Sequence, residues 1–126
     1  MSKITYFASR QKVLEVLAAA APIVWTAVPL GTFVPAGCTG LLCKVEIEQQ
    51  VLGGAPLWAM FQVRKDVAQG IASEVYMDGA WVNGTIQSDN ALIPVDAVPQ
   101  IEYTLIGAPA GTGTVNLRIY ALGYLT

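Results

Sequence analysis

Apolar and polar residues alternate with a period of two along most of this chain, which is the spacing of a strand that buries one face. The clearest window is residues 41–50. One side of it is apolar, with Leu41, Cys43, Val45 and Ile47, and the other side carries Leu42, Lys44, Glu46 and Glu48. The same alternation recurs over residues 57–63, 100–107 and 115–122. These windows predict antiparallel strands with one buried face and one solvated face.

Shorter windows predict further strands at residues 23–28, 74–77, 80–82, 85–87 and 91–95. Turn residues recur about every 8 to 12 positions, a spacing typical of an all-β sandwich or barrel. The Gly- and Pro-containing segment 52–56 indicates a hairpin or a connection between sheets, and segment 108–113 indicates a second hairpin. We therefore predict an all-β protein built as an antiparallel β-sandwich.

The N-terminal segment allows two interpretations. Residues 10–21 include four consecutive alanines, which favour a helix, but Pro22 ends that helix and a strand fits equally well. We favour a strand over residues 12–17. Residues 1–11 lie outside the alternating pattern and are predicted to form an N-terminal arm, either packed on a neighbouring subunit or frayed. Residues 12–126 are predicted to form a single β-sandwich domain.

The composition is unusually apolar: 54% of the 126 residues are hydrophobic, and the 13% that are charged are about half the usual share. No charge lies between Glu15 and Lys44, a span long enough for a transmembrane helix. Pro22, Pro29 and Pro35 would break that helix. A signal peptide is disfavoured because Glu15 lies within its apolar stretch. We expect no membrane insertion.

Candidate chemistry is sparse. The absence of histidine excludes Ser-His-Asp and Cys-His catalysis, and a net charge of −2 without a basic cluster disfavours nucleic acid as a partner. Glu46 and Glu48 share a strand face that we interpret as solvated surface. Asp78 and Asp89 fall in predicted loops without calcium-loop spacing. We predict no enzyme activity, no catalytic residue, no cofactor and no metal.

The two cysteines are separated by a short turn. A disulfide between Cys38 and Cys43 would need favourable Cβ geometry. The simplest interpretation of Cys43 is a small buried apolar residue, because it falls on the apolar side of its strand.

Two strands carry apolar residues on both faces. Trp58 and Met60 lie opposite Ala59 and Phe61, and Tyr120 and Leu122 interrupt the polar face of the last strand. Corner strands of a sandwich also bury both faces, but the low charge content favours burial against another subunit. We predict a homo-oligomer, with a trimer favoured. The candidate interface residues are Tyr6, Phe7, Trp58, Met60, Tyr120 and Leu122.

Three segments resemble small β-sandwich modules of tailed-bacteriophage virions. Residues 25–37 read WTAVPLGTFVPAG and resemble the entry to a strand in these modules. Residues 61–65, FQVRK, are similar to a following strand, and residues 120–125, YALGYL, are similar to the closing strand. The resemblance covers residues 25–126 and implies a jelly-roll-like sandwich. Cys38 stands where the family usually has alanine, and residues 1–24 have no counterpart.

The resemblance implies a virion structural protein: a capsid decoration protein of the cement or turret type, or the tip of a head fibre or tail fibre. A chain that begins at its own methionine without a shaft favours capsid decoration. The implied partners are further copies of itself and the major capsid protein or another virion protein. The implied location is the capsid surface, after synthesis in the host cytoplasm. The arm would anchor on the shell, while Glu46, Glu48, Asp78 and Asp89 would face solvent.

A second hypothesis is a module that binds a host receptor or glycan. Trp58, Tyr76 and Trp81 would then serve as stacking platforms for sugar rings.

Overall fold

The computed structural model describes residues 3–51, 57–79, 84–108 and 113–126. These residues contain eight strands. The strands are β1 (Ile4–Ala19), β2 (Ile23–Pro29), β3 (Gly40–Val51), β4 (Leu57–Arg64), β5 (Ile71–Gly79), β6 (Ile86–Pro94), β7 (Gln100–Ala108) and β8 (Thr114–Leu125).

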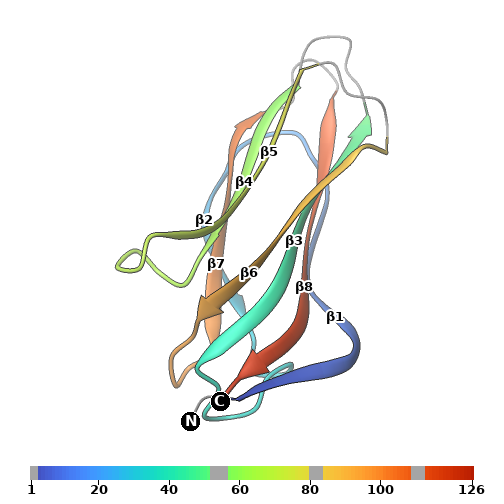
Figure 1. The fold of residues 1–126 in the computed structure, drawn as a ribbon. Helices are drawn as coiled ribbons and strands as arrows, with labels where there is room; N and C mark the ends of the chain where they lie inside the picture. Colours follow the sequence, from blue (N-terminus) through green and yellow to red (C-terminus); the bar gives the residue numbers. More distant parts are fainter. Residues whose placement is uncertain (1–2, 52–56, 80–83, 109–112) are drawn as a thin grey trace.

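The strands form two antiparallel sheets of four strands each (Figure 1). Sheet A has the order β1-β8-β3-β6, and sheet B has the order β2-β7-β4-β5. The chain pairs its first strand with its last, its second with its seventh, its third with its sixth and its fourth with its fifth. This nested wrapping is the connectivity of a jelly roll. The predicted all-β, jelly-roll-like sandwich is confirmed.

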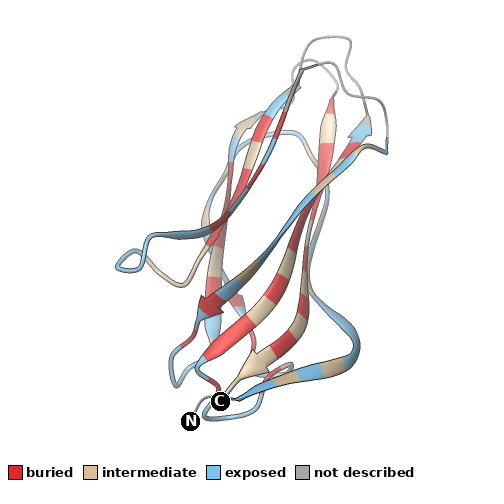
Figure 2. Ribbon diagram, viewed as in Figure 1, coloured by how far each residue is buried: buried red, intermediate tan, exposed pale blue. Residues whose placement is uncertain are grey.

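The core lies between the two sheets and is built from the apolar side of each alternating strand. Ile47 of β3, Phe61 of β4 and Leu117 of β8 are fully buried. Along β3 and β8 the buried positions alternate with more exposed ones, except where Glu46 and Asn116 are buried as well (Figure 2). Each such side chain contributes about 1.5–3 kcal/mol of burial free energy, so the period-two pattern is what holds the sheets together.

Most successive strands lie in different sheets, and two of these connections fall where the sequence predicts turns. Because β3 lies in sheet A and β4 in sheet B, the link through residues 52–56 is a sheet crossing, one of the two predicted alternatives. The hairpin predicted at residues 108–113 is wrong, because β7 and β8 lie in opposite sheets. Gly- and Pro-rich turns suit a tight hairpin and a sheet crossing alike, so the turn residues did not distinguish them.

The fifth and sixth strands differ from their predicted bounds. The strands predicted at residues 85–87 and 91–95 are parts of a single strand, β6. Asp89 therefore lies in a strand and not in a loop, and Asp78 lies within β5. The strand predicted at residues 80–82 falls outside the described residues.

The N-terminal segment is an edge strand of sheet A. The strand predicted over residues 12–17 is confirmed, and the helix is wrong. Residues 4–11, expected to form an arm, are the first half of the same strand, with Tyr6 opposite Gly123 of β8. A Cβ at Gly123 would lie 2.6 Å from the carbonyl oxygen of Thr5. Glycine at this position thus lets β1 approach β8 closely.

Candidate interaction surfaces

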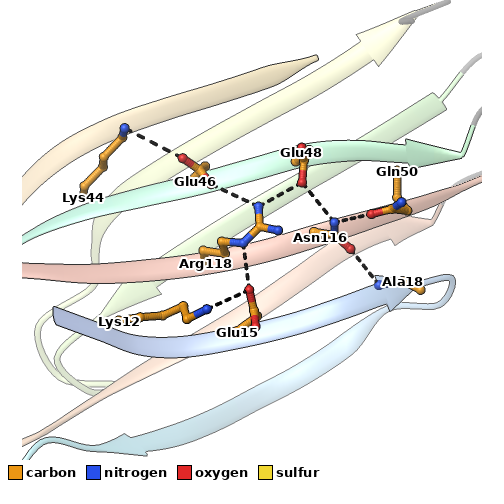
Figure 3. Close-up of polar contacts among 9 residues, drawn as sticks. All are labelled: Lys12, Glu15, Ala18, Lys44, Glu46, Glu48, Gln50, Asn116 and Arg118. Carbon is orange, nitrogen blue, oxygen red and sulfur yellow. Dashed lines mark hydrogen bonds and ion pairs between the residues drawn. The ribbon is translucent and has the colours of Figure 1, made fainter. Parts of the chain in front are cut away.

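A network of ion pairs covers the middle of the outer face of sheet A (Figure 3). Arg118 of β8 lies at its centre. Its Nε donates to Oε2 of Glu15 at 2.9 Å, and its Nη1 donates to Oε2 of Glu46 at 3.2 Å and to Oε1 of Glu48 at 2.9 Å. One guanidinium therefore ties the edge strand β1 and the inner strand β3 to β8.

Two lysines complete this network and balance its charge. Lys12 Nζ lies 3.1 Å from Oε2 of Glu15, and Lys44 Nζ lies 3.7 Å from Oε1 of Glu46. Three cations thus face three carboxylates. The hydrogen bond from Arg118 lowers the pKa of Glu15, and hydrogen bonds from Asn116 and then Arg118 lower the pKa of Glu48. Both carboxylates are held ionised, which suits a structural clasp.

The prediction that Glu46 and Glu48 face solvent is wrong for Glu46 and holds only in part for Glu48. Glu46 is only 6% exposed, and Glu48 is half-buried. The register places Glu15, Arg118 and Glu46 in one row across three strands, so their long side chains cover one another. The alternating pattern shows which face a residue lies on, but not that its neighbours on that face enclose it.

A row of apolar residues crosses the outer face of sheet A near the chain termini. Tyr6, Gly123, Leu42 and Leu92 are successive partners in β1, β8, β3 and β6. Tyr6 is 66% exposed and Leu92 is 49% exposed. Tyr6 was a candidate from the sequence, whereas Leu42 and Leu92 were missed. Their signal was present, since Leu42 falls on the polar side of the clearest predicted strand.

Three other predicted interface residues are partly covered within the chain. Phe7 packs against the core and lies 5.7 Å from the Tyr124 ring, centroid to centroid. Tyr120 is half-buried beneath the Arg10 guanidinium, which lies 4.0 Å from its ring centroid. Leu122 is also half-buried.

The sheet B cluster consists of Trp58, Met60, Tyr76 and Ile106 on the outer face of that sheet. Met60 lies opposite Tyr76 of β5 and Ile106 of β7, so the register brings the predicted residues Trp58, Met60 and Tyr76 together. Trp58, Tyr76 and Ile106 are 41%, 46% and 39% exposed. The indole of Trp58 lies over Gly107, where a Cβ would collide with it. Trp81, the third predicted stacking residue, falls outside the described residues.

An open cavity of about 380 Å³ lies beside the segment that follows β4. Lys65, Asp66, Asp96 and Val98 are among its lining residues. The Nζ of Lys65 lies 2.8 Å from Oδ1 of Asp96, and this hydrogen bond raises the pKa of Lys65. Lys65, the cation among the described residues that line this cavity, is therefore already engaged by a carboxylate.

Both cysteines are buried as free thiols. Burial raises the pKa of Cys43 to about 12, so little reactive thiolate is present at neutral pH. The interpretation of Cys43 as a small buried apolar residue is confirmed. No group of three or more Cys, Asp or Glu side chains suited to a metal ion occurs in the described part of the chain.

No model of a known protein family matches this chain, and no curated protein sequence matches it either. Across the ranges that the structure describes, no helix has the length and apolar character needed to cross a membrane.

Proposed function

We propose that this chain is a non-enzymatic structural protein of a tailed-bacteriophage virion, a capsid decoration protein that assembles as a homo-oligomer on the head shell. The observation that carries the proposal is the exposure of large apolar side chains on a sandwich whose own core is complete. Tyr6 and Leu92 on sheet A and Trp58 and Tyr76 on sheet B are all more than 40% exposed. Exposed apolar surface of this kind marks contacts with other subunits.

Two further points support a virion role. The jelly roll is an architecture of viral capsid and lectin domains, and residues 25–126 resemble the phage modules described above. The first of these is an analogy of fold, and folds host many functions. The exposed side chains therefore support packing on neighbouring subunits, and the resemblance supports the virion as the place where that packing occurs.

The test is electron microscopy of phage particles assembled with and without this gene product. The proposal predicts that protrusions on the head disappear when the protein is absent and return when purified protein is added. Particles with unchanged heads would refute it. Loss of density from a fibre tip would support the alternative function instead.

The alternative is a receptor- or glycan-binding tip module of a head or tail fibre. It is favoured by Trp58, whose indole lies along the strand at Gly107 and leaves part of its surface open to solvent. A flat, exposed aromatic ring offers an apolar surface against which a sugar ring can stack. Binding to host cells or to a glycan array that is lost in Trp58→Ala would support this function. Saturable binding to capsids alone would contradict it.

A further inference from the structure

The two edges of the sandwich carry charge of opposite sign. β5 and β6 contact each other across the sheets and form one edge, while β1 and β2 end the two sheets on the other side (Figure 1). The β1/β2 edge contains Lys3, Arg10 and Lys12 against a single acid, Glu15. The charged residues of β5 and β6 are all acidic, and they are Glu74, Asp78 and Asp89. One edge has a net charge of +2 and the other of −3.

The inner strands carry no such imbalance. Arg118 and Lys44 are paired with glutamates in the sheet A network. On sheet B, Arg64 Nε lies 2.8 Å from Oε1 of Glu102. The cations and carboxylates of the inner strands are equal in number. The charge available to a partner is therefore concentrated at the two edges.

Two of the acids on the β5/β6 edge, Glu74 and Asp89, lack a counterion within the described part of the chain. Glu74 accepts a hydrogen bond from Gln62 at 3.2 Å, and Asp89 accepts one from the Ser73 hydroxyl at 3.0 Å. Neither carboxylate forms an ion pair with a cation among the residues that the structure describes. On the opposite edge, Lys3 and Arg10 likewise have no carboxylate partner within those ranges. Each edge would gain from charges that the other supplies.

Apolar side chains lie beside these charges. Eight of the twelve large apolar side chains that are exposed in the described residues belong to the four edge strands. They are Ile4, Tyr6, Leu17, Val24, Ile71, Tyr76, Ile86 and Leu92. Among the described strands of sheet A, β1 pairs with β8 alone and β6 with β3 alone, so each has a second side that none of the described strands occupies. Such edges are templates for another chain.

We propose that copies of this chain associate head to tail, with the basic β1/β2 edge of one copy packed against the acidic β5/β6 edge of the next. This inference deepens the proposed function, because it rests on self-assembly and names the surface that performs it. Pairing two β1/β2 edges would bring charges of +2 together, and pairing two β5/β6 edges would bring charges of −3 together. Edges of opposite charge attract each other, whereas repulsion disfavours contacts between two like edges. A head-to-tail contact of this kind closes into a ring where the rotation permits.

Charge reversal tests the proposal in solution. Lys3→Glu/Arg10→Glu makes both edges acidic, and Glu74→Lys/Asp89→Lys gives both edges a net positive charge. We expect each double variant alone to associate at least about tenfold more weakly than the wild type, because like edges then meet. We expect association to recover in the quadruple variant, and in an equimolar mixture of the two double variants. Sedimentation velocity measures the mass of each, and circular dichroism checks that each is folded.

A matched control reverses charges away from the edges. Lys65→Glu/Asp96→Lys exchanges the two ends of the ion pair beside the open cavity, and we expect it to associate like the wild type. High salt should weaken wild-type association, because ions screen charges at an exposed interface.

The outcomes separate this inference from the proposed function. Double variants that associate as the wild type does, or a quadruple variant that fails to recover, would overturn the edge pairing and leave self-assembly intact. A wild-type mass equal to the 13.4 kDa monomer at micromolar concentration would overturn both.

Discussion

Replacing Arg118 with methionine tests whether the sheet A network holds the edge strand β1 in place. Methionine keeps much of the aliphatic stem but removes the guanidinium that contacts Glu15, Glu46 and Glu48. The Glu46 side chain is only 8% exposed and would retain only Lys44, at 3.7 Å. Removing one partner of a buried ion pair costs about 3–5 kcal/mol. Because Arg118 itself is 18% exposed, we expect the lower end, about 3 kcal/mol.

Urea denaturation measures this loss, at one fixed protein concentration because association would otherwise shift the midpoint. The free energy of unfolding falls by about 2 kcal/mol per molar urea, so a loss of about 3 kcal/mol lowers the urea midpoint by about 1.5 M. The control is Lys12→Met, which removes an exposed cation of the same network and should cost much less. Adding Glu46→Gln to Arg118→Met should restore part of the stability, because the buried charge is removed as well. Equal destabilisation by Arg118→Met and Lys12→Met would refute the reasoning.

Three further results are expected. Because the pKa values of Glu15 and Glu48 are lowered in the folded protein, the stability they contribute is present above their unfolded pKa and is lost as pH falls through the folded values. The urea midpoint should therefore drop below about pH 4.5, and it should drop less in Arg118→Met; parallel pH profiles would contradict this. Gly107→Ala, at a residue with φ +76° beneath the Trp58 indole, should lower the free energy of unfolding by about 1–3 kcal/mol. The loss should shrink in a Trp58→Ala background, and an equal loss there would show that the ring does not cause it. Finally, Cys43 should resist thiol reagents at pH 8 in the folded protein and react in urea, because it is buried with a pKa of about 12; rapid modification of the folded protein would count against a buried thiol.

The strands of the core could be predicted because side chains alternate strictly between the two faces of a strand. Residues 41–50 and 115–122 follow this rule, and the structure places them in β3 and β8. The sheet that each strand joins could not be predicted, because a Gly- or Pro-rich turn serves both a hairpin and a sheet crossing. The first strand was obscured for another reason. β1 shifts register between Tyr6 and Gln11, between Lys12 and Leu14 and between Val16 and Ala19, and each shift breaks the alternation.

The candidate surfaces depend on register as well. Trp58 and Met60 could be recognised as apolar residues on the wrong face of a strand. That Met60 lies opposite both Tyr76 and Ile106 is a property of two strand pairings. Likewise Arg118 and Glu15 are 103 positions apart in the chain, and no local pattern connects them. Residue types on a face follow from the sequence, but the neighbours of each residue follow from the order of strands in the sheet.

The most direct test of the central claim, that this sandwich presents surface for further copies of itself, is the mass of the purified protein in solution at micromolar concentration. Sedimentation velocity should give a multiple of the 13.4 kDa chain mass, falling as the protein is diluted or the salt raised. A single species of 13.4 kDa under all of these conditions would contradict the claim.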